Sequence, residues 1–147
     1  MKPMSRHELF RRMLDAPVGR VARQTPLEPA ERLSARLSRE VLLKREDLQP
    51  VFSFKLRGAY VCMGRLDAAR RARGVIAASA GNHAQGVALA AARLGIEARI
   101  VMPTTTPAIK VDAVRELGAE VALEGDSFDD AARYAQTLQR ETGATFI

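Results

Sequence analysis

The sequence has few of the residues that would mark several common classes of protein. Cys62 is the only cysteine in 147 residues, and the two histidines lie far apart, at His7 and His83. One cysteine excludes an internal disulfide, and the two histidines lack the spacing of a zinc motif. No apolar run approaches the ~20 residues that a membrane-spanning helix needs. We therefore expect no disulfide, no metal centre and no membrane segment.

Aromatic residues are also scarce, at 5% of the chain, and tryptophan is absent. The net charge of +6 invites a nucleic-acid interpretation. However, the arginines are spread along the chain, and no basic segment is interleaved with aromatic residues that would stack on bases. Charged residues run through positions 1–15, so the apolar core of a signal peptide is missing there. We expect a cytoplasmic protein without a nucleic-acid partner.

The second half of the chain alternates between short apolar runs and helical segments. We predict strands at Val75–Ala78, Ala98–Met102, Val121–Leu123 and from Thr145, and helices at His83–Leu94, Pro107–Leu117 and Phe128–Arg140. Asp126 or Ser127 would cap the last helix. This alternation predicts parallel strands joined by right-handed crossovers. The fold class is therefore α/β, an open parallel sheet with helices on both faces.

The first half has weaker patterns. We predict a helix over residues 5–23 that ends near Pro17, an extended segment at Thr25–Leu27, a linker or short helix over residues 29–37, a strand at Val41–Glu46, and helices at Phe54–Gly64 and Leu66–Arg73. Ser53 would cap the helix that begins at Phe54. We divide the chain into a helical and extended segment, residues 1–40, and an α/β part, residues 41–147.

Lys55 is a candidate for chemistry because lysine is rare in this chain. Only four of the 23 basic residues are lysines, and Lys55 lies among apolar neighbours in Ser53-Phe54-Lys55-Leu56. A lysine amine in partly desolvated surroundings can act as a nucleophile and form a Schiff base. A solvated lysine at the start of a helix is the alternative interpretation.

A second candidate motif, Ser79-Ala80-Gly81-Asn82-His83, follows the first predicted strand of the sheet. Open α/β sheets bind ligands at the carboxyl ends of their strands. The free N–H groups at the start of the next helix favour an anion, and Gly81 lets backbone approach a ligand closely. The alternative is an ordinary turn capped by Ser79 or Asn82. His83 is either a general base or a polar residue at a helix start.

Taken together, the two motifs resemble a known enzyme family. Ser53–Ala59 followed by Ser79–Gly86 resembles the fold-type II pyridoxal phosphate enzymes, the tryptophan synthase β family. Within it, the segments Lys44–Phe52, Ile100–Pro103 and Ile109–Arg115 are similar to the biosynthetic threonine dehydratases, or threonine ammonia-lyases. The resemblance covers residues 16–147 and implies a tryptophan synthase β-like fold. Residues 41–147 would then be the N-terminal part of the catalytic domain, its small α/β subdomain.

The resemblance implies a role for each motif residue. Lys55 would bind pyridoxal 5′-phosphate as a Schiff base and, once freed, remove the α-proton of the substrate. Phe54 would pack near the pyridine ring of the cofactor, and Asn82 would hydrogen-bond its 3′ oxygen. The substrate carboxylate would be bound by the backbone N–H groups of Ser79, Ala80, Gly81, Asn82 and His83.

The implied reaction is β-elimination of water from L-threonine, which yields 2-oxobutanoate and ammonia at the entry to isoleucine biosynthesis, in a homo-oligomeric enzyme. A catabolic serine/threonine dehydratase or a serine racemase is the second interpretation. A non-catalytic small-molecule-binding or interaction module is the third. In this family the glycine-rich phosphate loop and the regulatory domains follow the region matched here. We therefore expect an N-terminal portion that binds the cofactor weakly and turns over slowly or not at all.

Overall fold

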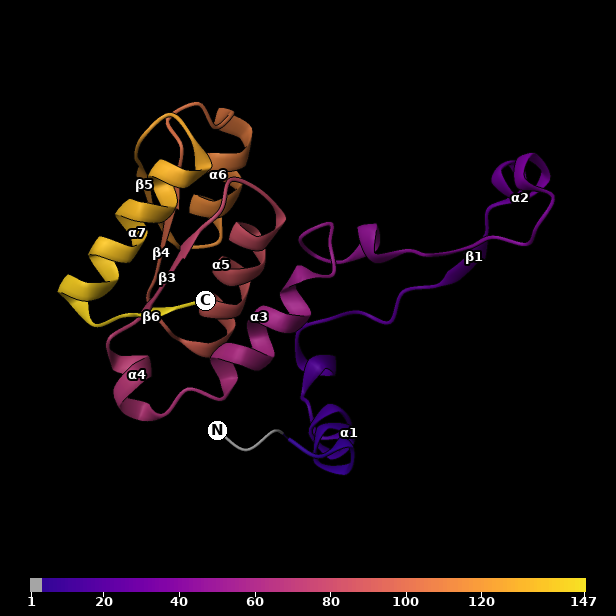
Figure 1. Ribbon diagram of the computed structural model, residues 1–147, viewed down its shortest axis with the longest axis horizontal. Coiled ribbons are helices and arrows are strands. Elements are labelled where there is room, and N and C mark those ends of the chain that lie inside the picture. The colour runs from indigo at the N-terminus through magenta and orange to yellow at the C-terminus, as the bar shows by residue number, and fades with distance from the viewer. Residues whose placement is uncertain (1–3) are drawn as a thin grey trace.

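The computed structural model describes residues 4–147 as an α/β body with an arm that extends from it (Figure 1). The helices are α1 (Arg6–Leu14), α2 (Glu31–Leu37), α3 (Lys55–Gly64), α4 (Ala68–Ala72), α5 (Asn82–Leu94), α6 (Ala108–Glu116) and α7 (Phe128–Thr142), with 3₁₀ turns η1 (Val18–Arg20) and η2 (Glu46–Leu48). The strands are β1 (Leu27–Pro29), β2 (Leu42–Lys44), β3 (Val75–Ala78), β4 (Ala98–Met102), β5 (Glu120–Leu123) and β6 (Thr145–Phe146). Within these residues, no helix has the length and apolar character needed to cross a bilayer.

The body is built on a parallel four-stranded sheet in the order β5-β4-β3-β6. Side chains of β3 alternate between the faces: Val75 and Ala77 belong to one core cluster, Ile76 and Ala78 to the other. Residues of α3, α5 and α6 fill the first cluster, and α7 covers the opposite face (Figure 1). The predicted α/β fold with helices on both faces is confirmed.

The helices of the body end as local sequence rules dictate. Gly95 adopts a left-handed conformation, φ 63°, and closes α5 at Leu94. Ser127, one of two predicted caps, begins α7 in a capping box with Asp130, in which each side chain accepts a hydrogen bond from the other residue's backbone. Gly95 thus ends α5 at the amino edge of the sheet, before β4, and Ser127 begins α7 at the carboxyl edge, after β5.

The prediction was less accurate in the first half. The helix predicted over residues 5–23 is wrong beyond Leu14: α1 ends there, and a separate 3₁₀ turn follows Pro17. Proline lacks an N–H group and disfavours helical backbone in the residue before it. The strand predicted at Val41–Glu46 is shorter, and it pairs antiparallel with β1 in the arm. The two paired strands lie on opposite sides of residue 40 in the sequence. The domain boundary that we proposed at this residue stays a prediction.

The predicted cap of α3 was wrong as well. Phe54, with helical backbone angles, occupies the N-cap position, and no side chain in the described part of the chain caps the helix there. Ser53 is buried, and its Oγ has no hydrogen-bond partner within residues 4–147. The helix that carries Lys55 therefore begins without the stabilisation that a serine cap supplies.

Candidate active site at the start of α3 and α5

Lys55 is the first residue of α3, and Phe54 precedes it. The Lys55 amine lies 5.5 Å from the centre of the Phe54 ring, a cation–π distance. Both side chains are exposed, so the partial desolvation expected from the apolar neighbours of Lys55 is not seen in this structure. The amine is accessible to a reagent or a cofactor.

The motif from Ser79 to His83 forms the turn between β3 and α5. Ser79 caps the turn, since its Oγ accepts hydrogen bonds from the N–H groups of Gly81, at 3.3 Å, and Ala84, at 3.2 Å. Within the described residues, the N–H groups of Asn82 and His83 donate to no acceptor. The turn thus combines both interpretations: a serine cap, and two free donors at the positive end of a 13-residue helix.

The structure brings Lys55 and His83 to one pocket of about 440 Å³, whose lining residues are Phe54, Lys55, Arg57, Gly58, Ala59, Cys62, His83 and Ile147. His83 Nε2 lies 3.1 Å from the backbone oxygen of Ile147. Asn82, Gly81, Ala80 and Ser79 do not line this pocket, although they belong to the same turn as His83. The two motifs therefore meet through His83.

Another hollow lies at the opposite edge of the sheet, with a volume of about 390 Å³. Its lining includes Arg73 before β3, Glu97 before β4 and Glu120 at the start of β5, which are the amino ends of the strands. Open parallel sheets bind ligands at the carboxyl ends. The pocket of Lys55 and His83 is therefore the better candidate.

Gly86 of α5 explains how the two helices come so close. A Cβ atom at this position would lie 3.0 Å from the backbone nitrogen of Leu56, 3.0 Å from the carbonyl carbon of Lys55 and 3.3 Å from Lys55 Cβ. Only glycine lets the backbone of α5 touch the first turn of α3 without displacement. Gly86 belongs to the motif Ser79–Gly86, but nothing in the sequence indicates this close approach.

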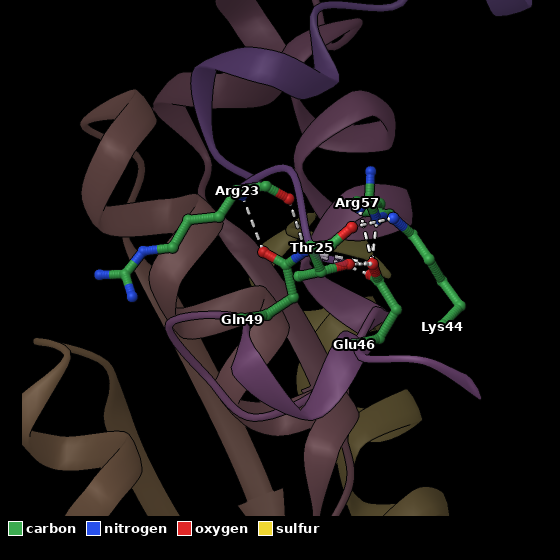
Figure 2. A network of polar contacts seen from close by, with 6 residues as sticks. All are labelled: Arg23, Thr25, Lys44, Glu46, Gln49 and Arg57. Carbon is green, nitrogen blue, oxygen red and sulfur yellow. Dashed lines mark hydrogen bonds and ion pairs between the residues drawn. The ribbon is translucent and has the colours of Figure 1, made fainter. Parts of the chain in front are cut away.

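A polar network that no sequence pattern predicts lies beside the same turn (Figure 2). Arg57 donates from Nε to Glu46 Oε2 at 2.8 Å and from Nη2 to Glu46 Oε1 at 2.9 Å. Thr25 Oγ1 donates to Glu46 Oε1 at 2.7 Å. The hydrogen bonds from Arg57 lower the pKa of Glu46 to about 2, against the effect of burial, so the carboxylate stays charged at neutral pH.

Gln49 and Lys44 complete the network. Gln49 is 1% exposed, and it binds the backbone of Arg23 twice: Oε1 accepts from N at 2.9 Å and Nε2 donates to O at 2.9 Å. Lys44 Nζ donates to the backbone oxygen of Thr25. The contacts of Arg57, Lys44, Thr25 and Gln49 with their main partners span 11, 19, 21 and 26 positions along the chain. Because no local spacing links them, no sequence pattern pointed to the network.

The donor groups fit a phosphorylated aldehyde cofactor and an amino-acid substrate. A primary amine, from Lys55, is what an aldehyde requires. Free N–H groups, from Asn82 and His83, are what a carboxylate or phosphate requires. Gly86 keeps the two helix starts adjacent. Lys55 is therefore the residue of this pocket whose chemistry suits a cofactor with an aldehyde group.

The comparisons with known proteins agree with this fit. Residues 18–147 match the family described as "Pyridoxal-phosphate dependent enzyme". The chain therefore belongs to the family of pyridoxal-phosphate-dependent enzymes, and the predicted resemblance is confirmed.

Among curated relatives the chain is similar to biosynthetic threonine dehydratases. It is 56% identical to "L-threonine dehydratase biosynthetic IlvA" of Burkholderia multivorans, over 98% of this chain and 29% of that protein. It is also 56% identical to the protein of the same name from Escherichia coli, over 95% of this chain and 27% of that protein. The chain thus spans less than a third of the length of these relatives.

Solved structures give the same fold. The processed form of threonine deaminase isoform 2 from Solanum lycopersicum matches with a TM-score of 0.90 and 54% identity, over 98% of this chain and 40% of that one. Maize serine racemase matches with a TM-score of 0.85 and 34% identity, over 92% of this chain and 41% of that one.

Proposed function

We propose that this chain supplies the lysine-bearing part of a pyridoxal-phosphate-dependent threonine dehydratase, which converts L-threonine to 2-oxobutanoate and ammonia in isoleucine biosynthesis. The observation that carries the proposal is the meeting of Lys55 and His83 in one pocket, in a chain 56% identical to biosynthetic threonine dehydratases.

In this proposal Lys55 forms the covalent link to the cofactor aldehyde and, when free, takes the proton from the substrate Cα. The cofactor, when bound, acts as an electron sink for the carbanion at Cα. The α-proton and the β-hydroxyl leave as water, and a water molecule then releases ammonia from the eliminated product to give 2-oxobutanoate. The free N–H groups of Asn82 and His83 bind the substrate carboxylate.

Phe54 and Asn82 have supporting roles in the proposal. Phe54 lies next to the Lys55 amine, where its ring would pack near the pyridine ring. The exposed Asn82 side chain would donate to the 3′ oxygen of the cofactor. Ser79 holds the turn in shape through its two backbone hydrogen bonds, with Ala80 and Gly81 between.

The test is cofactor binding by the purified chain. Pyridoxal phosphate should produce a visible absorption band, and borohydride reduction followed by peptide mass spectrometry should place the cofactor on Lys55. Lys55→Ala should abolish the band. Lys110→Ala, which removes an exposed lysine of α6, should leave it unchanged. Threonine-dependent release of 2-oxobutanoate tests the reaction. A chain that binds no cofactor would support a non-catalytic module instead.

A serine-directed enzyme is the second candidate, favoured by the match to maize serine racemase. Parallel assays with L-threonine and L-serine separate the two, since a dehydratase of the biosynthetic type should release more oxoacid from L-threonine. Formation of D-serine from L-serine would favour a racemase.

We also propose a cytoplasmic location and assembly into homo-oligomers. The relatives include bacterial proteins and also tomato and Arabidopsis proteins named as chloroplastic. Cell fractionation tests the location, and sedimentation of the purified chain tests its assembly.

A further inference from the structure

The N-cap residue of α3 gives its first turn no side-chain hydrogen bond, as in α2 and α6, although this turn carries the candidate cofactor lysine. Phe54 gives no side-chain hydrogen bond at the N-cap. Ser53, 6% exposed, has no partner for its Oγ among residues 4–147. An uncapped first turn frays more readily. Contacts from elsewhere in the structure therefore matter more for the position of Lys55.

Arg57 provides that contact from the same turn as Lys55. Its guanidinium binds both carboxylate oxygens of Glu46, at 2.8 and 2.9 Å, as a fork (Figure 2). Bidentate pairs of this kind fix orientation as well as distance. The side chain of Glu46 is only 16% exposed, so solvent competes weakly for it.

Glu46 is itself fixed on its other side. Its carboxylate also accepts from Thr25 and from the Gln49 amide. Gln49 is buried and holds the backbone of Arg23. Because each partner of Glu46 is anchored in a different segment, the carboxylate gives Arg57 a fixed point on the body of the protein.

We propose that the Glu46–Arg57 ion pair is a positioning device for Lys55. It fixes the first turn of α3 against the network, while Gly86 of α5 limits the turn from the other side. The Lys55 amine is thereby held in the pocket with His83. The proposal rests on the proposed function, in which the orientation of this amine governs its reaction with an aldehyde.

Two variants of the purified chain test the pair. Glu46→Gln keeps the shape of the side chain and removes its charge, and Arg57→Lys keeps the charge and removes the fork. Glu28→Gln is the matched control, since Glu28 binds Arg45 Nη1 at 2.6 Å in the arm. All are compared well below their unfolding temperatures, so that differences reflect the folded state.

The main measurement is the rate of labelling by pyridoxal phosphate and borohydride at Lys55, relative to labelling at Lys110 in the same sample. A misplacement of a reacting group by about 1 Å can slow its reaction up to a hundredfold. We expect Glu46→Gln and Arg57→Lys to lower the Lys55 to Lys110 ratio by about tenfold or more. Glu28→Gln should leave the ratio unchanged, and the circular dichroism of the bound cofactor should weaken only in the first two variants.

A second measurement needs no cofactor. Amide hydrogen exchange at residues 57–60, where the Arg57 N–H donates to the Phe54 carbonyl at 3.0 Å, should become about tenfold faster in Glu46→Gln, while α7 is unaffected. The proposal would be overturned if folded Glu46→Gln and Arg57→Lys showed the same rates of labelling and of hydrogen exchange as the wild type. Equal labelling of Lys55 and Lys110 in the wild type would refute the cofactor role of Lys55, and the exchange rates would then decide the positioning role alone.

Discussion

The first turn of α3 is held from two sides that differ in their chemistry. On one side, the backbone of α5 touches Lys55 at Gly86, a contact that leaves no space for one more carbon atom. On the other side, Glu46 and Arg57 form a hydrogen-bonded ion pair anchored in distant segments. Packing sets how far the turn can move, whereas the ion pair sets its orientation. The difference shows that one reactive side chain can depend on two kinds of support.

The largest effect is expected on the polar side. Glu46→Ala leaves Arg57, Thr25 and Gln49 without their shared acceptor, and because Thr25 and Gln49 are buried this costs about 2–3 kcal/mol. Urea unfolding measures the loss. Glu28→Ala breaks the more exposed Arg45 pair and should cost at most about 0.5 kcal/mol. Equal losses in the two variants would contradict the distinction between a sheltered and an exposed pair.

Gly86→Ala tests the packing side. The new methyl group would meet backbone atoms at 3.0 Å, so α3 and α5 must separate, at a cost of about 2 kcal/mol. Gly64→Ala is the control, because a Cβ there meets nothing within 4 Å. It should raise the free energy of unfolding by up to about 0.5–1 kcal/mol. A neutral Gly86→Ala would mean that the helices can separate freely.

The same two sides show what the sequence could predict. The turn around Ser79 and the glycine after it are contiguous, and their position after an apolar strand points to a ligand site. Strand and helix alternation from Val75 onward gave the sheet and its two covered faces correctly. These features follow from neighbours along the chain, which a single sequence displays.

The missed features depend on contacts between distant residues. Glu46 and Arg57 are charged residues eleven positions apart, and charged residues are usually solvated, so nothing marked them as partners. Ser53 is a common helix-capping residue type, yet among residues 4–147 its buried Oγ has no hydrogen-bond partner and caps no helix. Only the three-dimensional structure shows that α3 begins without a cap. Only the structure shows that the Glu46–Arg57 ion pair contacts this first turn instead.

The stability that the Glu46–Arg57 pair provides should also depend on pH, whereas the packing contact at Gly86 should not. The folded state lowers the pKa of Glu46 from its usual 4.5 to about 2. A lowered pKa gives stability that is present above the unfolded value and is lost as the pH falls toward the folded one. The free energy of unfolding of the wild type should therefore fall toward that of Glu46→Gln between about pH 5 and pH 2. Urea midpoints of both proteins across this range measure it, and a constant difference would contradict the charge-based explanation.

The smallest effect is expected in the turn that leads from Gln49 of the polar network to Lys55. Phe52 adopts a left-handed conformation, φ 55°, and its side chain is 75% exposed, so the residue has strained backbone and little packing to compensate. Left-handed backbone costs an ordinary residue about 1–2 kcal/mol. Phe52→Gly should therefore raise the free energy of unfolding by about 1 kcal/mol. Phe52→Ala removes the ring but keeps the Cβ that causes the strain, so it should bring no such gain. If both variants are equally stable, the turn is not strained, and the path from Gln49 to Lys55 is held by the ion pair and the helix contact alone.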